Sequence, residues 1–172
     1  DFIKTFSELQ IVPLTISYEY EPCDYLKVQE LYLSSLHSKY IKAPGEDLNS
    51  IVTGVKQYKG KIHLSFGTPI TEELISINES GNDNEKIKKL TAVIDKHIYN
   101  AYKLNPVNYI AYDTINDTNI FESYYLPAEK VNFLNYVNDK TKQLKGEEDV
   151  LKNIFFKMYA MPLINKLQIN SK

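Results

Sequence analysis

The sequence predicts a helix-rich α/β fold with two strands, at about residues 10–18 and 61–66, and about six helices. Residues 11–18 form an apolar, β-branched run that ends in a polar turn, which is typical of a strand buried on both faces in a parallel sheet. Residues 61–66 alternate apolar and polar side chains, which indicates a strand exposed on one face. Apolar residues at helical spacing recur through most of the remaining chain.

The predicted helices have apolar stripes bounded by capping residues, glycines or prolines, and they cover residues 24–39, 47–59, 85–103, 105–115, 127–145 and 147–161. Asp24 and Asp47 are expected as caps, and Pro162 is expected to break or kink the last helix. Residues 1–9 form an irregular lead-in or a short helix, and another short helical segment starts at Thr71. The polar residues 76–84 separate residues 1–75 from a helical region at 85–166.

Composition excludes several classes of protein. The chain has 172 residues, of which 43% are hydrophobic and 24% are charged, as in a globular protein. All of its 20 basic residues are lysines and the net charge is −2, so no nucleic-acid surface is expected. One cysteine, Cys23, permits neither a disulfide nor a thiolate metal cluster, and no bound cofactor or metal is expected. We expect a cytoplasmic protein, with a peripheral position at the inner face of the membrane left open.

Three blocks of sequence resemble the glycerophospholipid acyltransferases, the 1-acyl-glycerol-3-phosphate acyltransferase superfamily. Residues 12–18 read Val-Pro-Leu-Thr-Ile-Ser-Tyr and continue as Glu-Tyr-Glu-Pro-Cys-Asp, similar to a bacterial branch of glycerol acyltransferases. Residues 60–70, Gly-Lys-Ile-His-Leu-Ser-Phe-Gly-Thr-Pro-Ile, resemble the strand and turn that follow in that family. Residues 105–113, Asn-Pro-Val-Asn-Tyr-Ile-Ala-Tyr-Asp, resemble a further block.

The resemblance implies transfer of an acyl group from acyl-CoA or acyl-carrier protein to the hydroxyl of glycerol phosphate or a lysophospholipid. It makes residues 1–75 the C-terminal part of an acyltransferase-like α/β domain. It places Val12, Pro13 and Ile16 in the wall behind the substrate, with core packing as the alternative. Glu19 is a further candidate for substrate binding, because it lies with two other acidic residues at the end of the strand. A solvated turn is the competing interpretation of these carboxylates.

The family's catalytic block, His-x-x-x-x-Asp, is absent from this sequence. The residues five positions after His37, His63 and His97 are Lys42, Thr68 and Tyr102. The family's phosphate-binding arginine is also absent, so no catalytic residue is assigned. Because two strands alone are marginal in water, we expect the chain to be the C-terminal portion of a larger protein whose upstream catalytic half supplies the reactive groups.

Two other functions stay open. The chain could be a non-catalytic helical module that docks to a partner or to a membrane surface, with Lys86, Lys88 and Lys89 contacting anionic headgroups. A hydrolase that uses Cys23 at a helix N-terminus is a more distant alternative. An exposed sheet edge is also expected to favour pairing of copies into a homo-oligomer.

Overall fold

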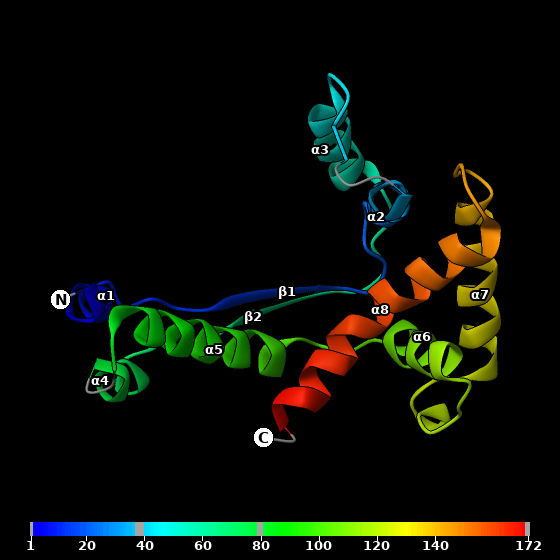
Figure 1. Cartoon of the computed structure of the whole chain (residues 1–172). Coiled ribbons are helices and arrows are strands. Elements are labelled where there is room, and N and C mark those ends of the chain that lie inside the picture. Colours follow the sequence, from blue (N-terminus) through cyan, green and yellow to red (C-terminus); the bar gives the residue numbers. More distant parts are fainter. Residues whose placement is uncertain (1, 37–39, 79–80, 171–172) are drawn as a thin grey trace. The chain divides into compact units, whose positions relative to one another are not determined.

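The computed structural model describes residues 2–36, 40–78 and 81–170. Within these ranges the chain forms eight α-helices, one short 3-10 helix and two strands, so the predicted helix-rich α/β class is confirmed. The chain divides into two compact units, each assembled from segments far apart in sequence (Figure 1). The first unit comprises Asp1–Ser17, His63–Lys103 and Asn165–Lys172, and the second comprises Tyr18–Ile62 and Leu104–Ile164.

The first unit is built from three helices and most of the sheet. Its elements are α1 (Phe2–Glu8), α4 (Glu72–Asn78) and α5 (Asp83–Ala101), with β1 (Leu14–Tyr18) and β2 (Ile62–Phe66) except for one terminal residue of each strand. Helix α4 packs against both α1 and α5. The core between them consists of buried aliphatic side chains, namely Ile3, Ile70, Leu74, Ile77 and Leu90.

The two strands are antiparallel, so the predicted parallel sheet is wrong. Gly67 N–H donates to the carbonyl of Pro13 and Glu19 N–H donates to that of Lys61, both at 2.9 Å, so residue 13 lies opposite 67 and residue 19 opposite 61. Antiparallel strands can leave one face in water, and β1 does so. Its even-numbered aliphatic residues are exposed, whereas Thr15 and Ser17 are buried.

Burial of β1 on both faces was therefore also a wrong prediction, and α5 provides the reason. The hydroxyl of Thr15 donates to the carbonyl of Ile98 at 3.5 Å, and that of Ser17 accepts from Lys103 N–H at 2.9 Å. The polar face of β1 is thus tied to the last turn of α5 and to Lys103 just beyond the helix. Helix α5 covers only one face of β1, and the β-branched composition of the strand does not reveal which face that is.

The second unit is helical. It contains α2 (Asp24–Leu36), α3 (Glu46–Lys56), α6 (Pro106–Asn116), the 3-10 helix η1 (Glu122–Tyr124), α7 (Pro127–Thr141) and most of α8 (Glu148–Asn170). Fully buried aromatic rings from α7 and α8, Phe133 and Phe155, lie in its core. Gly45, not the predicted Asp47, is the N-cap of α3, and Asp47 lies in the first turn.

Helix α8 continues through Pro162, so of the predicted break or kink the break is wrong. Proline removes one N–H donor, but the residues after it keep theirs. Leu163, directly after the proline, is 3% exposed, and Lys166 donates from Nζ to the carbonyls of Asn100 and Tyr102. These contacts hold the helix beyond the proline. None of the helices in the described ranges is both long and apolar enough to cross a membrane.

Candidate functional site

A cavity of about 380 Å³ opens in the first unit beside the start of β1. Its lining comes from the turns next to the sheet and from α4 and α5: Pro13, Gly67, Thr68, Glu73, Val93, Lys96, His97, Asn100 and Ala101. The first three residues belong to the sequence blocks that resemble the acyltransferases. A Cβ added at Gly67 would lie 3.1 Å from the carbonyl oxygen of Pro13, so glycine allows the two segments to approach closely.

A histidine and a carboxylate face each other in this cavity. His97 Nε2 on α5 lies 3.0 Å from Glu73 Oε1 on α4, and their side chains are 28% and 43% exposed. The pKa of Glu73 is lowered by a hydrogen bond from its own backbone N–H and by His97. A carboxylate that holds one ring nitrogen leaves the other free to accept a proton from a ligand, which is the arrangement of a general base.

The sequence did not reveal this pair. Glu73 precedes His97 by 24 residues, and the two come together only because α4 packs on α5. A test at fixed His-x-x-x-x-Asp spacing therefore misses them. The acidic first turn of α4 was visible in the sequence, but nothing local connects it to a histidine on the next helix.

The four predicted substrate-binding residues do not form one site. Pro13 lines the cavity. Val12 and Ile16 are 46% and 44% exposed, and Ile16 lies on the sheet face opposite to the one that α5 covers. Glu19 belongs to the second unit, where its Oε2 accepts from Lys61 N–H at 2.9 Å. Of the four, only Pro13 is placed to contact a ligand in the cavity.

The Cys23 environment does not favour a nucleophile. Its thiol donates to the carbonyl of Ser50 at 3.3 Å, and burial raises the thiol pKa, with Glu21 adding to the effect. A raised pKa lowers the thiolate fraction on which cysteine reactivity depends. The predicted carboxylate cluster is also dispersed, because Glu21 pairs with Lys27 at 3.1 Å while Asp24 points into the core of the second unit.

Asp24 is a buried anchor of three helices. It is 1% exposed, and its Oδ2 accepts from the hydroxyls of Tyr136 on α7 and Tyr159 on α8, at 2.6 and 2.7 Å. Its Oδ1 accepts from Tyr25 N–H at 2.6 Å. Burial raises the pKa of Asp24, and the tyrosine hydrogen bonds oppose that rise. The tyrosine pKa values are raised in turn, first by burial.

The third sequence block has a similar structural role at the two ends of α6. Asn108 accepts from Asn105 N–H and donates to the carbonyl of Tyr159, both at 2.8 Å. Asp113, 1% exposed, accepts from the Tyr125 hydroxyl at 2.9 Å. Backbone N–H of Phe121 and the hydroxyl of Thr118 donate to the same carboxylate. Asn108 and Asp113 are thus accounted for by the packing of the second unit.

No metal centre is present in the part of the chain that the structure describes, because no three His, Cys, Asp or Glu side chains converge there. Comparison with known proteins adds no assignment: no family model, curated protein or solved structure matches this chain. The cavity with His97 and Glu73 is the candidate site in the first unit.

Proposed function

We propose that this chain is the C-terminal region of an acyltransferase. The enzyme would move an acyl group from acyl-CoA or acyl-carrier protein to the hydroxyl of glycerol phosphate or a lysophospholipid. The order of the three sequence blocks supports this, as does the pairing of the first two: Pro13 of the Val-Pro strand lies opposite Gly67 of the Gly-Thr-Pro turn. The catalytic His-x-x-x-x-Asp block would come from an upstream half of the same protein.

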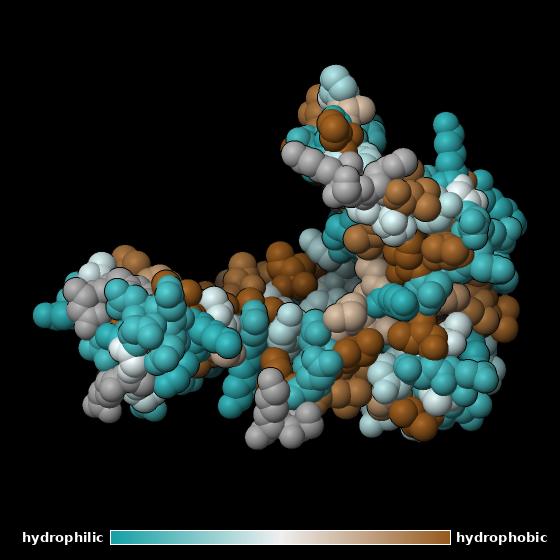
Figure 2. Space-filling view, viewed as in Figure 1, coloured by the Kyte–Doolittle hydropathy of each residue, from teal (hydrophilic) through white to brown (hydrophobic). Residues whose placement is uncertain are grey.

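The open sheet is the observation that carries the proposal. With two strands in the described part of the chain, each strand has one edge without a strand partner there. Hydrophobic side chains gather over β1 and β2 (Figure 2). In the first unit this apolar sheet face consists of Val12, Leu14, Ile16, Leu64 and Phe66, which are 44–72% exposed. Leu14 lies opposite Phe66, and Ile16 lies opposite Leu64.

The apolar sheet face is large enough to be a contact surface. Five aliphatic or aromatic side chains at this exposure present on the order of 500 Å² of apolar surface, and patches of that size are often functional. A two-stranded sheet is marginal by itself. Further strands and helices from an upstream half would pair the edges and cover this face. The candidate cavity, which begins at Pro13, would then lie beside the completed sheet.

The upstream coding sequence provides the first test. We expect it to encode His-x-x-x-x-Asp, and the longer protein to release thiol from acyl-CoA when glycerol 3-phosphate or lysophosphatidate is added. Residues 1–172 alone are expected to be inactive in the same assay. An upstream sequence without the motif, or acyl transfer by the chain alone, would contradict the proposal.

Two matched substitutions test the missing layer. Leu64→Lys should leave the stability of residues 1–172 unchanged, because Leu64 is 48% exposed there, but should destabilise the longer protein, in which it would be covered. Ile75→Lys on α4, at a position 65% exposed, is the control and should be tolerated in both. If copies of the chain pair through this face instead, Leu64→Lys will dissociate a dimer in sedimentation velocity, and the missing layer is refuted.

A further inference from the structure

Helix α3 turns its apolar residues outward. Leu48, Ile51, Val52 and Val55 follow the i, i+3, i+4, i+7 spacing of one helix face, and they are 65%, 65%, 40% and 75% exposed. We call these four residues the α3 stripe. In a self-contained domain such a stripe normally faces the core. Here the buried residue of the helix is the polar Thr53, at 8% exposure.

The face of α3 opposite to the stripe carries small residues and packs against the turn before α2. Cys23 Sγ donates to the carbonyl of Ser50, and a Cβ added at Gly54 would lie 3.5 Å from the same sulfur. At the N-terminal end, the carboxylate of Glu46 accepts from the hydroxyl of Tyr40 at 2.5 Å. The helix is therefore held by its small, polar side, which leaves the stripe in solvent.

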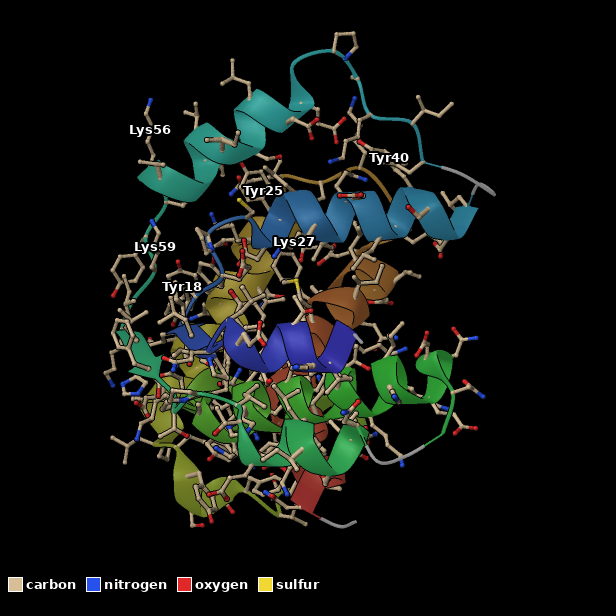
Figure 3. All side chains as sticks on the ribbon, turned by 90° about the vertical axis from the view of Figure 1, so that its left-hand side faces the viewer. Tyr18, Tyr25, Lys27, Tyr40, Lys56 and Lys59 are labelled. Carbon is tan, nitrogen blue, oxygen red and sulfur yellow. The ribbon has the colours of Figure 1, made fainter. Side chains whose placement is uncertain are left out.

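The charged side chains at the two ends of α3 differ in their partners. At the N-terminal end, Glu46 is bonded to Tyr40, and Asp47 pairs with Lys42 at 2.7 Å. At the other end, Lys56 is exposed, and Lys59 donates from Nζ only to backbone carbonyls. Neither of these two lysines has a carboxylate partner among the described residues. Figure 3 shows Lys56 and Lys59 at one end of α3 and Tyr40 toward the other.

We propose that the α3 stripe docks on an anionic lipid surface. The four aliphatic side chains would enter the boundary between headgroups and acyl chains, and Lys56 and Lys59 would reach lipid phosphates. Tyr58, 73% exposed just beyond the helix, suits the interfacial level. With 11 residues, α3 is about 16 Å long, which suits a helix lying in the plane of the interface and not one that spans it.

The two lysines without carboxylate partners support an anionic lipid as the occupant, because a lipid surface offers phosphates beside the apolar stripe. A second copy in an antiparallel contact would bring its own Glu46 and Asp47 to these lysines, and this is the alternative that the test below separates. The inference rests on the proposed function, whose acceptor is a lipid or lipid precursor, but its readout is binding and not acyl transfer.

Sedimentation with vesicles tests the docking of α3. The chain should bind phosphatidylcholine vesicles that contain phosphatidylglycerol more tightly than vesicles of phosphatidylcholine alone. Ile51→Asp should weaken binding at least about tenfold, because it places a charge in the stripe. Ile120→Asp is the matched control, since Ile120 is also 65% exposed and lies away from α3, and it should bind as the unmodified chain does.

A charge series separates the electrostatic part of the interaction. Lys56→Gln and Lys59→Gln should each weaken binding to the anionic vesicles about fivefold and leave binding to neutral vesicles unchanged. Lys157→Gln, an exposed position on α8, should have no effect. If Ile51→Asp does not fold by circular dichroism, Val55→Asp, at the most exposed position of the stripe, replaces it in the same experiment.

Two results would overturn the docking proposal. One is equal vesicle binding by the Ile51→Asp and Ile120→Asp variants. The other is a dimer in the absence of lipid that Ile51→Asp dissociates, because a second copy would then be the occupant. Acyl transfer by the longer protein to glycerol 3-phosphate, a soluble acceptor, should survive Ile51→Asp. Loss of vesicle binding with that activity intact supports docking, whereas absence of any acyl transfer refutes only the proposed function.

Discussion

Replacing Tyr125 by Phe should destabilise the second unit. The Tyr125 hydroxyl donates to Asp113 Oδ2 at 2.9 Å, and the whole residue is 7% exposed. The substitution removes the hydroxyl and preserves the ring, so packing against the core is retained. Asp113 keeps two other donors, the hydroxyl of Thr118 and the backbone N–H of Phe121.

The hydrogen bond gives the magnitude. A hydrogen bond to a charged acceptor contributes about 1.5–3 kcal/mol to the free energy of unfolding. We therefore expect Tyr125→Phe to lower the free energy of unfolding by about 1.5–3 kcal/mol at neutral pH. Burial, and then Asp113, raise the pKa of Tyr125 from 10.0 to about 12, and this shift governs only how the contribution changes with pH.

The raised pKa also predicts how the contribution of the Tyr125 hydroxyl to stability changes with pH. Because the pKa is higher in the folded state, the stabilisation by the Tyr125 hydroxyl is complete below about pH 10 and is lost as the pH rises through about 12. Urea unfolding followed by circular dichroism should show the full difference at pH 7 and a smaller one above pH 10. Tyr112→Phe is the control, since the Tyr112 hydroxyl makes no hydrogen bond to the described residues. A loss below about 0.5 kcal/mol, or an equal loss for the control, would refute the reasoning.

Three further substitutions test other parts of the structure. Asp24→Asn should remove a contribution that lowers stability as the pH rises above about 4, because burial raises the pKa of Asp24 and favours its protonated form. Parallel pH profiles of urea midpoints for the variant and the wild-type chain would contradict this. Gly60→Ala should lower the melting temperature more than Gly45→Ala. Both glycines have positive φ, but a Cβ added at Gly60 would lie 2.9 Å from the Cβ of Glu19, whereas a Cβ added at Gly45 would have no atom within 4 Å. His97→Gln should cost under about 1 kcal/mol in urea unfolding, because its ion pair is partly solvated, and a larger cost would assign the pair a structural role.

Local signals predicted the helices well. Asn105 and Pro106 mark the start of α6, and Pro127 marks that of α7, because capping and the fixed φ of proline act within one turn. The break that was one of the two outcomes expected at Pro162 does not occur, for the opposite reason. Whether a helix survives a proline depends on what holds the residues after it, and the carbonyls that bind Lys166 lie more than 60 residues earlier in the chain.

The polar anchors could not be predicted from the sequence. Asp24 was expected as a helix cap, and it is the first residue inside α2. Its partners Tyr136 and Tyr159 are 112 and 135 residues away, however, and no local pattern connects them. The same holds for His97 and Glu73. Of the predicted substrate-binding residues, only Pro13 reaches the candidate cavity, because a conformational preference of the strand does not specify where its side chains point.

Periodicity tells which residues share a face, but not whether that face is covered. Leu14 and Ile16 share one side of β1, and the stripe residues share one side of α3, as their spacing requires. Which side turns inward is decided by partners. Helix α5 offers a carbonyl to Thr15, Lys103 beyond it offers an N–H to Ser17, and Cys23 contacts the small face of α3. Buried hydroxyls need such partners, whereas aliphatic side chains need only to leave water. Both apolar faces therefore stay available for a covering layer, and a strand or a lipid surface can provide it.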